Sequence, residues 1–224
     1  MNSHAARSGM VLDDDRFIER ADPRLRPSLI EGRTHFVYYS GAAQIPESSV
    51  ADTSNKSFTM TASIDVPKTG GGDGVIVAKG GVAGGYTLFI KQGKPRFEYN
   101  WYTQERYKIA SSASVTPGKN VIKVDFKYDG GGIGKGGLVT LYLNDKKVGE
   151  GRVEKTEVAG RFSADETFDT GFDSASPVSA DYKSPFSFPG TVNKVEIDIA
   201  PTNLSQSDRK KIEIAQVRAL LTRE

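Results

Sequence analysis

Apolar and polar residues alternate in short runs through most of this chain, and this two-residue period constrains the fold more than any other feature. In the run Asn120–Tyr128, every second residue from Ile122 onward is apolar, and the residues between are lysine or aspartate. Successive side chains of a strand point to opposite faces, so one face of this run should pack in a core while the other contacts water. Similar runs rich in Val, Ile, Tyr, Phe and Thr predict strands at Thr34–Tyr39, Ser57–Val66, Gly74–Lys79, Tyr86–Gln92, Pro95–Tyr102, Arg106–Ser111, Asn120–Tyr128, Leu138–Asn144, Lys147–Val153 and Thr191–Ile199.

These runs predict an all-β fold class. About ten strands, without the long helices that parallel crossovers require, favour an antiparallel, jelly-roll-like β-sandwich with a short C-terminal helix; a closed barrel is the alternative. Gln92–Lys94 and Asn144–Lys146 contain residues that tolerate positive φ, and each predicts a hairpin turn. A chain of 224 residues can bury the core of one such domain.

The sequence divides into three parts. Residues 1–33 are predicted to be a leader and linker arm, because Pro23 and Pro27 interrupt any helix there. Residues 34–200 form the predicted sandwich domain, and residues 201–224 contain the predicted C-terminal helix.

The C-terminal helix has its own start signal and apolar stripe. Ser205 or Ser207 can cap its first turn, and Ile214, Val217 and Leu221 recur at helical spacing. We expect this stripe to dock on the sandwich or on a partner.

Composition excludes several classes of function. Thirty Lys and Arg against 28 Asp and Glu give a net charge of +2, too balanced for the basic surface that nucleic acid or anionic membrane demands. The absence of cysteine removes disulfides, thiolate metal sites and cysteine nucleophiles. With no long apolar run and no signal-like N-terminal segment, a cytoplasmic location is expected.

Motifs that carry catalysis elsewhere are incomplete here, so no catalytic residue is predicted. Gly132–Gly137 matches G-x-G-x-x-G, but a strand rather than the required helix is predicted from Leu138 onward, which favours a flexible connector. The strand containing Glu196–Asp198 lacks the second glutamate that a retaining glycosidase needs. His35, the only histidine of the predicted sandwich, is expected to be partly buried on a sheet rather than catalytic.

One aromatic cluster is a candidate binding site. Aromatic faces beside Asn, Gln and Arg are typical of sugar-binding grooves. Alternation places Tyr99 and Trp101 on one face, so the alternative is that both belong to the core. The candidate ligand-binding residues are Tyr99, Trp101, Tyr102, Arg106 and Tyr107.

The stretch Arg161–Gly190 has no clear period and carries spaced acids. Asp165, Asp169 and Asp173 recur every four residues, and hard cations such as calcium take several oxygen ligands. These three are therefore candidate metal ligands for calcium. The alternative is that they are solvated or paired with neighbouring Lys and Arg; otherwise no cofactor is expected.

Several spaced segments, in order, resemble the C-terminal domain of large bacterial arylsulfatases, which is similar in type to concanavalin-A-like and laminin-G-like sandwiches. The segments that carry the resemblance are Arg33–Thr34, Tyr38–Tyr39, Gly84–Lys91, Phe97–Trp101, Glu105–Tyr107, Phe126–Gly132, Gly149–Arg152, Arg161–Asp169 and Gly190–Thr191, with Asp13–Arg16 similar to the linker that leaves the catalytic domain.

The resemblance implies an accessory domain without catalytic residues. The chain has no C-x-P-S-R-like or S-x-P-x-R-like motif from which formylglycine is made, so we expect no sulfatase activity from it. The implied function is a non-catalytic interaction domain of an arylsulfatase-like enzyme, with a sulfatase catalytic domain as partner and homo-oligomerisation as a further expectation. The alternative is a carbohydrate-binding, lectin-like module for glycans that include sulfated ones.

Overall fold

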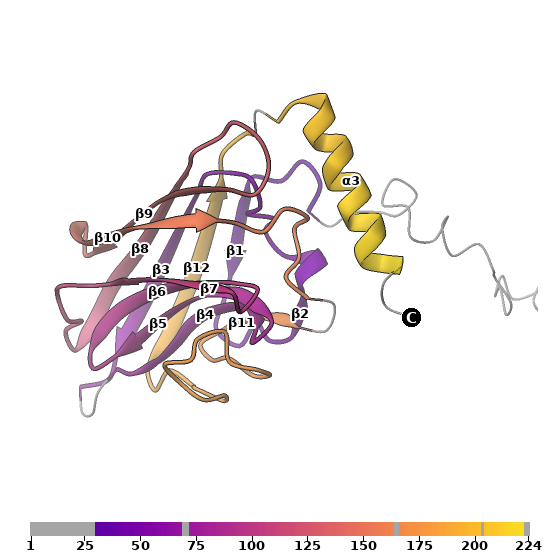
Figure 1. The fold of residues 1–224 in the computed structure, drawn as a ribbon. Helices are drawn as coiled ribbons and strands as arrows, with labels where there is room; N and C mark the ends of the chain where they lie inside the picture. The colour runs from indigo at the N-terminus through magenta and orange to yellow at the C-terminus, as the bar shows by residue number, and fades with distance from the viewer. Residues whose placement is uncertain (1–29, 69–71, 164–165, 203, 222–224) are drawn as a thin grey trace, which may run out of the picture.

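Two six-stranded antiparallel sheets, A and B, pack face to face in the computed structural model (Figure 1). The structure describes residues 30–68, 72–163, 166–202 and 204–221, with the side chains of 216–221 left out. Sheet A contains, in spatial order, β1 (His35–Tyr38), β12 (Thr191–Ile199), β3 (Phe58–Val66), β8 (Gly118–Tyr128), β9 (Lys135–Leu143) and β10 (Lys146–Lys155). Sheet B contains β2 (Ile45–Pro46), β11 (Thr167–Thr170), β4 (Gly74–Gly81), β5 (Gly84–Lys91), β6 (Lys94–Trp101) and β7 (Glu105–Ala110). The predicted antiparallel sandwich is confirmed.

Strands β2 and β11 were not predicted. β11 lies inside the stretch in which no period could be found, and β2 has only two residues. In β11, Phe168, Asp169 and Thr170 are all buried, because both faces of the strand are covered. A strand covered on both faces does not alternate, so its sequence carries no two-residue signal.

The core lies between the sheets and follows the predicted alternation. In β8, Ile122, Val124 and Phe126 are buried, while the lysines and aspartate between them are partly or fully exposed. Fully burying one such side chain contributes roughly 1.5–3 kcal/mol to folding. In β12, Val195 and Ile197 point inward in the same way.

Both predicted hairpin turns are confirmed by their backbone angles. Gln92 and Gly93 have φ of 55° and 70°, and Asn144 and Asp145 have φ of 49° and 63°. Two consecutive residues at positive φ are characteristic of the type I′ turns that match the twist of a hairpin.

The glycine run connects β8 to β9, and no helix follows it. Its last two glycines, Gly136 and Gly137, lie in β9, where an added Cβ would collide with the carbonyl oxygens of Val153 and Lys127. These glycines therefore permit close strand packing, which confirms the predicted connector rather than a phosphate loop.

The segment after β11 folds over the outer face of sheet B, the face turned away from sheet A (Figure 1). Val178, Tyr182 and Phe186 from this segment form a second small core with residues of β4 and β5. The Tyr182 ring lies 5.2 Å from that of Phe89 and 5.1 Å from that of Phe186, measured between centroids. The long stretch without a period is thus ordered by its own packing against the sheet. We call residues 171–190 the covering segment.

The C-terminal helix begins where the sequence predicted, but the described part of its apolar stripe is not packed on the sandwich. The Oγ of Ser205 accepts a hydrogen bond of 3.1 Å from the backbone N–H of Asp208, which confirms Ser205 as the cap of α3 (Gln206–Leu221). Ile214 is 45% exposed, so this residue is not docked on the sandwich, and docking of the stripe on a partner stays a prediction. The other two stripe positions, 217 and 221, lie outside the described side chains.

His35 is exposed, and the prediction of partial burial was wrong. Its Nδ1 lies 2.7 Å from Oδ1 of Asp198 on the neighbouring strand, which explains the outward orientation.

No helix in the described part of the chain has both the length and the apolar character needed to cross a membrane.

Replacing Tyr182 by Phe should lower the free energy of unfolding by about 1–3 kcal/mol. The Tyr182 hydroxyl donates a hydrogen bond of 2.6 Å to Asp173, a carboxylate only 2% exposed, and the variant leaves that acceptor short of a partner. Urea denaturation measures the change. The matched control is Tyr142→Phe on the outer face of sheet A, where the ring contacts Lys123, and it should change stability little. Equal losses in the two variants would contradict this role for Tyr182.

Candidate functional site

The β6–β7 hairpin ends in a turn that the side chain of Asn100 holds in place. Tyr102 and Thr103 adopt positive φ of 48° and 63°, a conformation that bulky residues rarely take. Asn100 is fully buried; its Oδ1 accepts a 2.9 Å hydrogen bond from the Thr103 N–H, and its Nδ2 donates to the carbonyl oxygens of Gly81 and Val82. Backbone strain of this kind persists only where the surroundings enforce it, and it concentrates at functional sites.

Three aromatic rings meet at this turn. The Trp101 and Tyr102 ring centroids are 5.9 Å apart, and those of Tyr102 and Phe162 are 6.1 Å apart. All three side chains are half-buried, and they form what we call the tip patch. The Lys155 ammonium lies 4.5 Å from the Trp101 ring centroid and 2.5 Å from Oε1 of Glu105. One face of the Trp101 ring is thus occupied by a cation that is itself paired.

The structure divides the predicted aromatic cluster between two faces of sheet B. Tyr99 is 7% exposed and belongs to the core, where its hydroxyl accepts a 2.8 Å hydrogen bond from the Glu157 N–H. Tyr107, opposite Tyr99 on β7, is half-buried and donates to Glu105. Arg106 points to the outer face instead. Of the five predicted ligand-binding residues, only Trp101 and Tyr102 lie together in the tip patch.

The buried Tyr99 ring cannot serve as a ligand platform, so the core alternative holds for this residue. The Nη1 of Arg106 is also occupied, because it donates to the Val178 carbonyl oxygen at 2.6 Å and to Oε1 of Glu98 at 3.0 Å. Its role is to fasten the covering segment to β6.

The predicted metal ligands have structural roles. Asp169 accepts hydrogen bonds from the N–H groups of Gln44 at 2.6 Å and Ser174 at 3.0 Å. Asp173 accepts from the Tyr182 hydroxyl, while residue 165 lies outside the described residues. Among the described residues, no group of three or more His, Asp or Glu side chains is placed to hold a metal ion. The four-residue spacing therefore does not bring Asp169 and Asp173 into such a group.

Two buried carboxylates fix the loop that carries Phe162. Glu47 accepts hydrogen bonds from the N–H groups of Phe162 and Ser163 at 3.0 and 3.1 Å. Glu157 accepts from those of Ala159 and Gly160, in the same loop. Each glutamate is 3% exposed.

Burial changes the protonation of these acids. It raises the pKa of Glu157 to about 7, against the lowering effects of the Ala159 N–H and the Lys79 ammonium. Burial also raises the pKa of Glu47, again opposed by Lys79. Lys79 is itself 2% exposed. This single cation therefore stabilises the ionised form of both glutamates beneath the tip patch.

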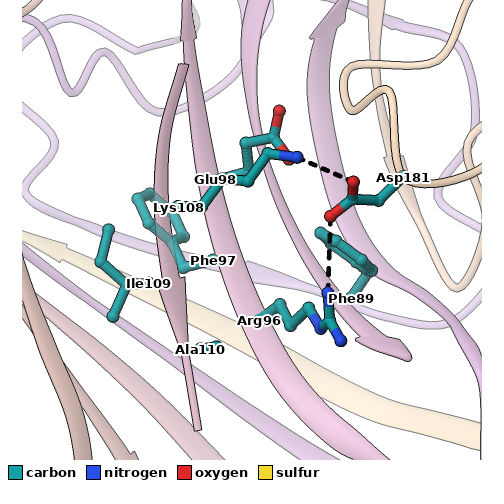
Figure 2. A pocket seen from close by; sticks show the side chains of 8 residues that line it. All are labelled: Phe89, Arg96, Phe97, Glu98, Lys108, Ile109, Ala110 and Asp181. Carbon is teal, nitrogen blue, oxygen red and sulfur yellow. Dashed lines mark hydrogen bonds and ion pairs between the residues drawn. The ribbon is translucent and has the colours of Figure 1, made fainter. Parts of the chain in front are cut away.

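A small pocket lies on the outer face of sheet B, next to the covering segment (Figure 2). Lys108 Nζ lies 2.7 Å from Oδ1 of Asp181, and Arg96 Nη1 lies 3.5 Å from Oδ2 of the same carboxylate. The hydrogen bond from Lys108 lowers the pKa of Asp181. The residues that line this outer-face pocket are Phe89, Arg96, Phe97, Glu98, Lys108, Ile109, Ala110 and Asp181.

The charged side of this hairpin was not predicted. Arg96 and Glu98 alternate with Phe97 and Tyr99 along β6, and Lys108 pairs with Glu98 across β6 and β7. Charged residues at every second position of two paired strands could have predicted that one face of the hairpin is charged. Asp181 could not be found this way, because it reaches the pocket from the covering segment.

No family model and no curated protein matches this chain. Among solved structures, NanB with Optactamide has a TM-score of 0.51 at 14% identity, over 79% of this chain and 27% of that chain. The CBM40 of Ruminococcus gnavus IT-sialidase, bound to α2,3-sialyllactose, has a TM-score of 0.49 at 11% identity, over 81% and 96% of the two chains. Domains LG4-5 of the mouse laminin α1 chain have a TM-score of 0.40 at 12% identity, over 80% and 42%. The likeness to NanB concerns the fold alone, a sandwich of two packed β-sheets.

Stability should fall as pH rises through neutrality, because the pKa of Glu157 is raised from 4.5 to about 7 in the folded protein. The folded state then binds a proton that the unfolded state releases, so the stabilisation is complete below pH 4.5 and is lost as pH approaches 7. Between about pH 5 and pH 8, we expect the free energy of unfolding to decrease by on the order of 2–3 kcal/mol from this group.

Urea denaturation across this pH range tests the assignment. Glu157→Gln should remove most of the pH dependence, whereas Glu154→Gln, at a carboxylate that is 59% exposed, should leave it intact. A slope that survives in Glu157→Gln would assign the titration to another buried acid.

Proposed function

We propose that this chain is a non-catalytic module that binds carbohydrate at the tip of the β6–β7 hairpin. The observation that carries the proposal is the tip patch, in which Trp101, Tyr102 and Phe162 meet at the surface on a strained turn. Such strain costs roughly 1–3 kcal/mol per residue. Ring contacts of Tyr102 and the hydrogen bond from Asn100 hold the turn in this conformation.

Carbohydrate suits the chemistry around these rings. Aromatic rings offer apolar faces to the C–H surfaces of sugars, while nearby polar groups fix the hydroxyls. Thr103 and Gln104 are exposed in the turn itself, and Lys155 and Glu105 flank Trp101. The tip thus offers donors and acceptors on both sides of its apolar surface.

The acids beside the tip patch support binding rather than hydrolysis. Glu47 and Glu157 are 3% exposed, and backbone N–H groups occupy both carboxylates. A glycosidase needs two carboxyl groups that reach the scissile bond from either side. These two face into the protein, where their hydrogen bonds hold the Phe162 loop.

An accessory role beside a sulfatase catalytic domain stays a prediction from the sequence segments. The comparisons show no link to sulfatases and agree better with the carbohydrate-binding alternative.

Screening the purified chain against an array of neutral, carboxylated and sulfated oligosaccharides, followed by calorimetric titration of the best ligand, tests the proposal. Trp101→Ala should weaken binding at least about tenfold, as expected for an aromatic residue at the centre of a binding surface. Tyr102→Gly should do the same while relaxing the turn, because glycine accepts the positive φ of 48° without strain.

Tyr39→Ala is the matched control, since Tyr39 is 65% exposed and lies outside the hairpin. It should bind like the wild type. The proposal is rejected if no glycan binds, or if the two tip variants bind as tightly as the control.

A further inference from the structure

Arg96, in the outer-face pocket, has hydrogen-bond donors that the described residues do not satisfy. Its Nε is buried and has no hydrogen-bond partner there. Its Nη1 and Nη2 reach Asp181 Oδ2 and Gln92 Oε1 only at 3.5 Å, longer than the roughly 3.2 Å of ordinary N–H···O bonds. Buried donors without acceptors are rare and costly, at about 1–3 kcal/mol each.

The surroundings of Arg96 carry an excess of positive charge. Lys108 and Arg106 surround Glu98, and Lys108 and Arg96 surround Asp181. The carbonyl oxygen of Asp181 also accepts a hydrogen bond from the Lys91 ammonium. Three cations thus share two carboxylates, and the Lys91 ammonium adds a fourth positive charge beside them, so this cluster has two more positive than negative charges.

The Arg96 side chain is 27% exposed, although its Nε is buried. Ala110 lies directly opposite Arg96 in the cross-strand register, and it is exposed on the edge strand of sheet B. Ala110, Arg96 and Lys108 line the same small pocket. Lys108, two residues away on the same face, is 45% exposed.

We propose that the outer-face pocket is a binding site for a carboxylate or sulfate group, held by Arg96 and Lys108. The Nε–H and one Nη–H of an arginine form a planar fork that matches two oxygens of such an anion. Lys108 supplies a second charge, since an ammonium has three donors and Asp181 uses one of them at 2.7 Å. The site lies on the opposite face of β6 from Trp101, so it does not depend on the carbohydrate proposal.

The orphaned donor is also the best reporter for the test. The Arg96 Nε–H signal, assigned by its loss in Arg96→Lys, is followed in proton–nitrogen correlation spectra. Sodium sulfate and sodium acetate are titrated separately, at ionic strength held constant with sodium chloride. We expect a saturable shift of this signal. Saturation by sulfate alone assigns the site to sulfate esters, by acetate alone to carboxylates, and by both to either group.

Ala110→Glu gives a variant that should fold and yet lose the site. Opposite residues in an antiparallel pair have Cβ atoms about 5 Å apart, so the new carboxylate can occupy the Arg96 fork from within the protein. Anion binding should weaken at least about tenfold. Ala110→Gln, of the same shape without the charge, should retain measurable saturation. The proposal is overturned if chloride shifts the signal as much as sulfate and acetate do, or if Ala110→Glu saturates like the wild type.

Discussion

The two-residue pleat of β6 and β7 gives one hairpin two different surfaces. Phe97 and Tyr99 point into the sandwich and the half-buried Trp101 packs against the core at the end of the strand, while Arg96, Glu98 and Asn100 point to the outer face. Asn100 connects the outer face to the turn. Its Nδ2 donates to the Gly81 carbonyl oxygen, and its Oδ1 accepts the hydrogen bond from the Thr103 N–H that fixes the turn at the end of the hairpin. Shifting β6 by one residue would exchange the two faces, so packing of the aromatic side against the core fixes the position of the charged side as well.

A second constraint lies beneath the tip patch, where Lys79 and two glutamates are buried together. Taking these charges out of water is costly, and the attraction between them offsets that cost only when their remaining hydrogen bonds are made. Glu47 and Glu157 each meet this condition with two backbone N–H groups of the loop before β11. The same bonds fix Phe162 beside Tyr102. The position of the Phe162 loop is therefore fixed by buried polar groups as well as by apolar packing.

The features that were predicted correctly from the sequence are those that depend on residues close together in the chain. The alternation of β8 and the turn at Asn144 were found from the sequence because each depends on neighbouring residues only. β11 and the covering segment were missed because their order comes from distant partners, such as the Gln44 N–H, 125 positions before its acceptor Asp169. The regular spacing of Asp169 and Asp173 suggested a shared cation, yet each carboxylate is occupied by donors that the spacing could not reveal. Tyr99 and Arg106 were grouped by proximity in the chain, although the pleat separates them.

The two outer-face arginines explain why residue type alone could not identify the proposed anion site. Arg106 was the predicted ligand-binding arginine, but Val178 and Glu98 hold its Nη1 at 2.6 and 3.0 Å. Arg96 has longer contacts and a buried Nε without an acceptor. The covering segment creates this difference. It places the Val178 carbonyl oxygen 2.6 Å from Arg106, whereas the acceptor that it offers Arg96, Oδ2 of Asp181, lies 3.5 Å away. An arginine can bind a ligand only with donors that the fold leaves unsatisfied, and the Nε–H of Arg96 is such a donor.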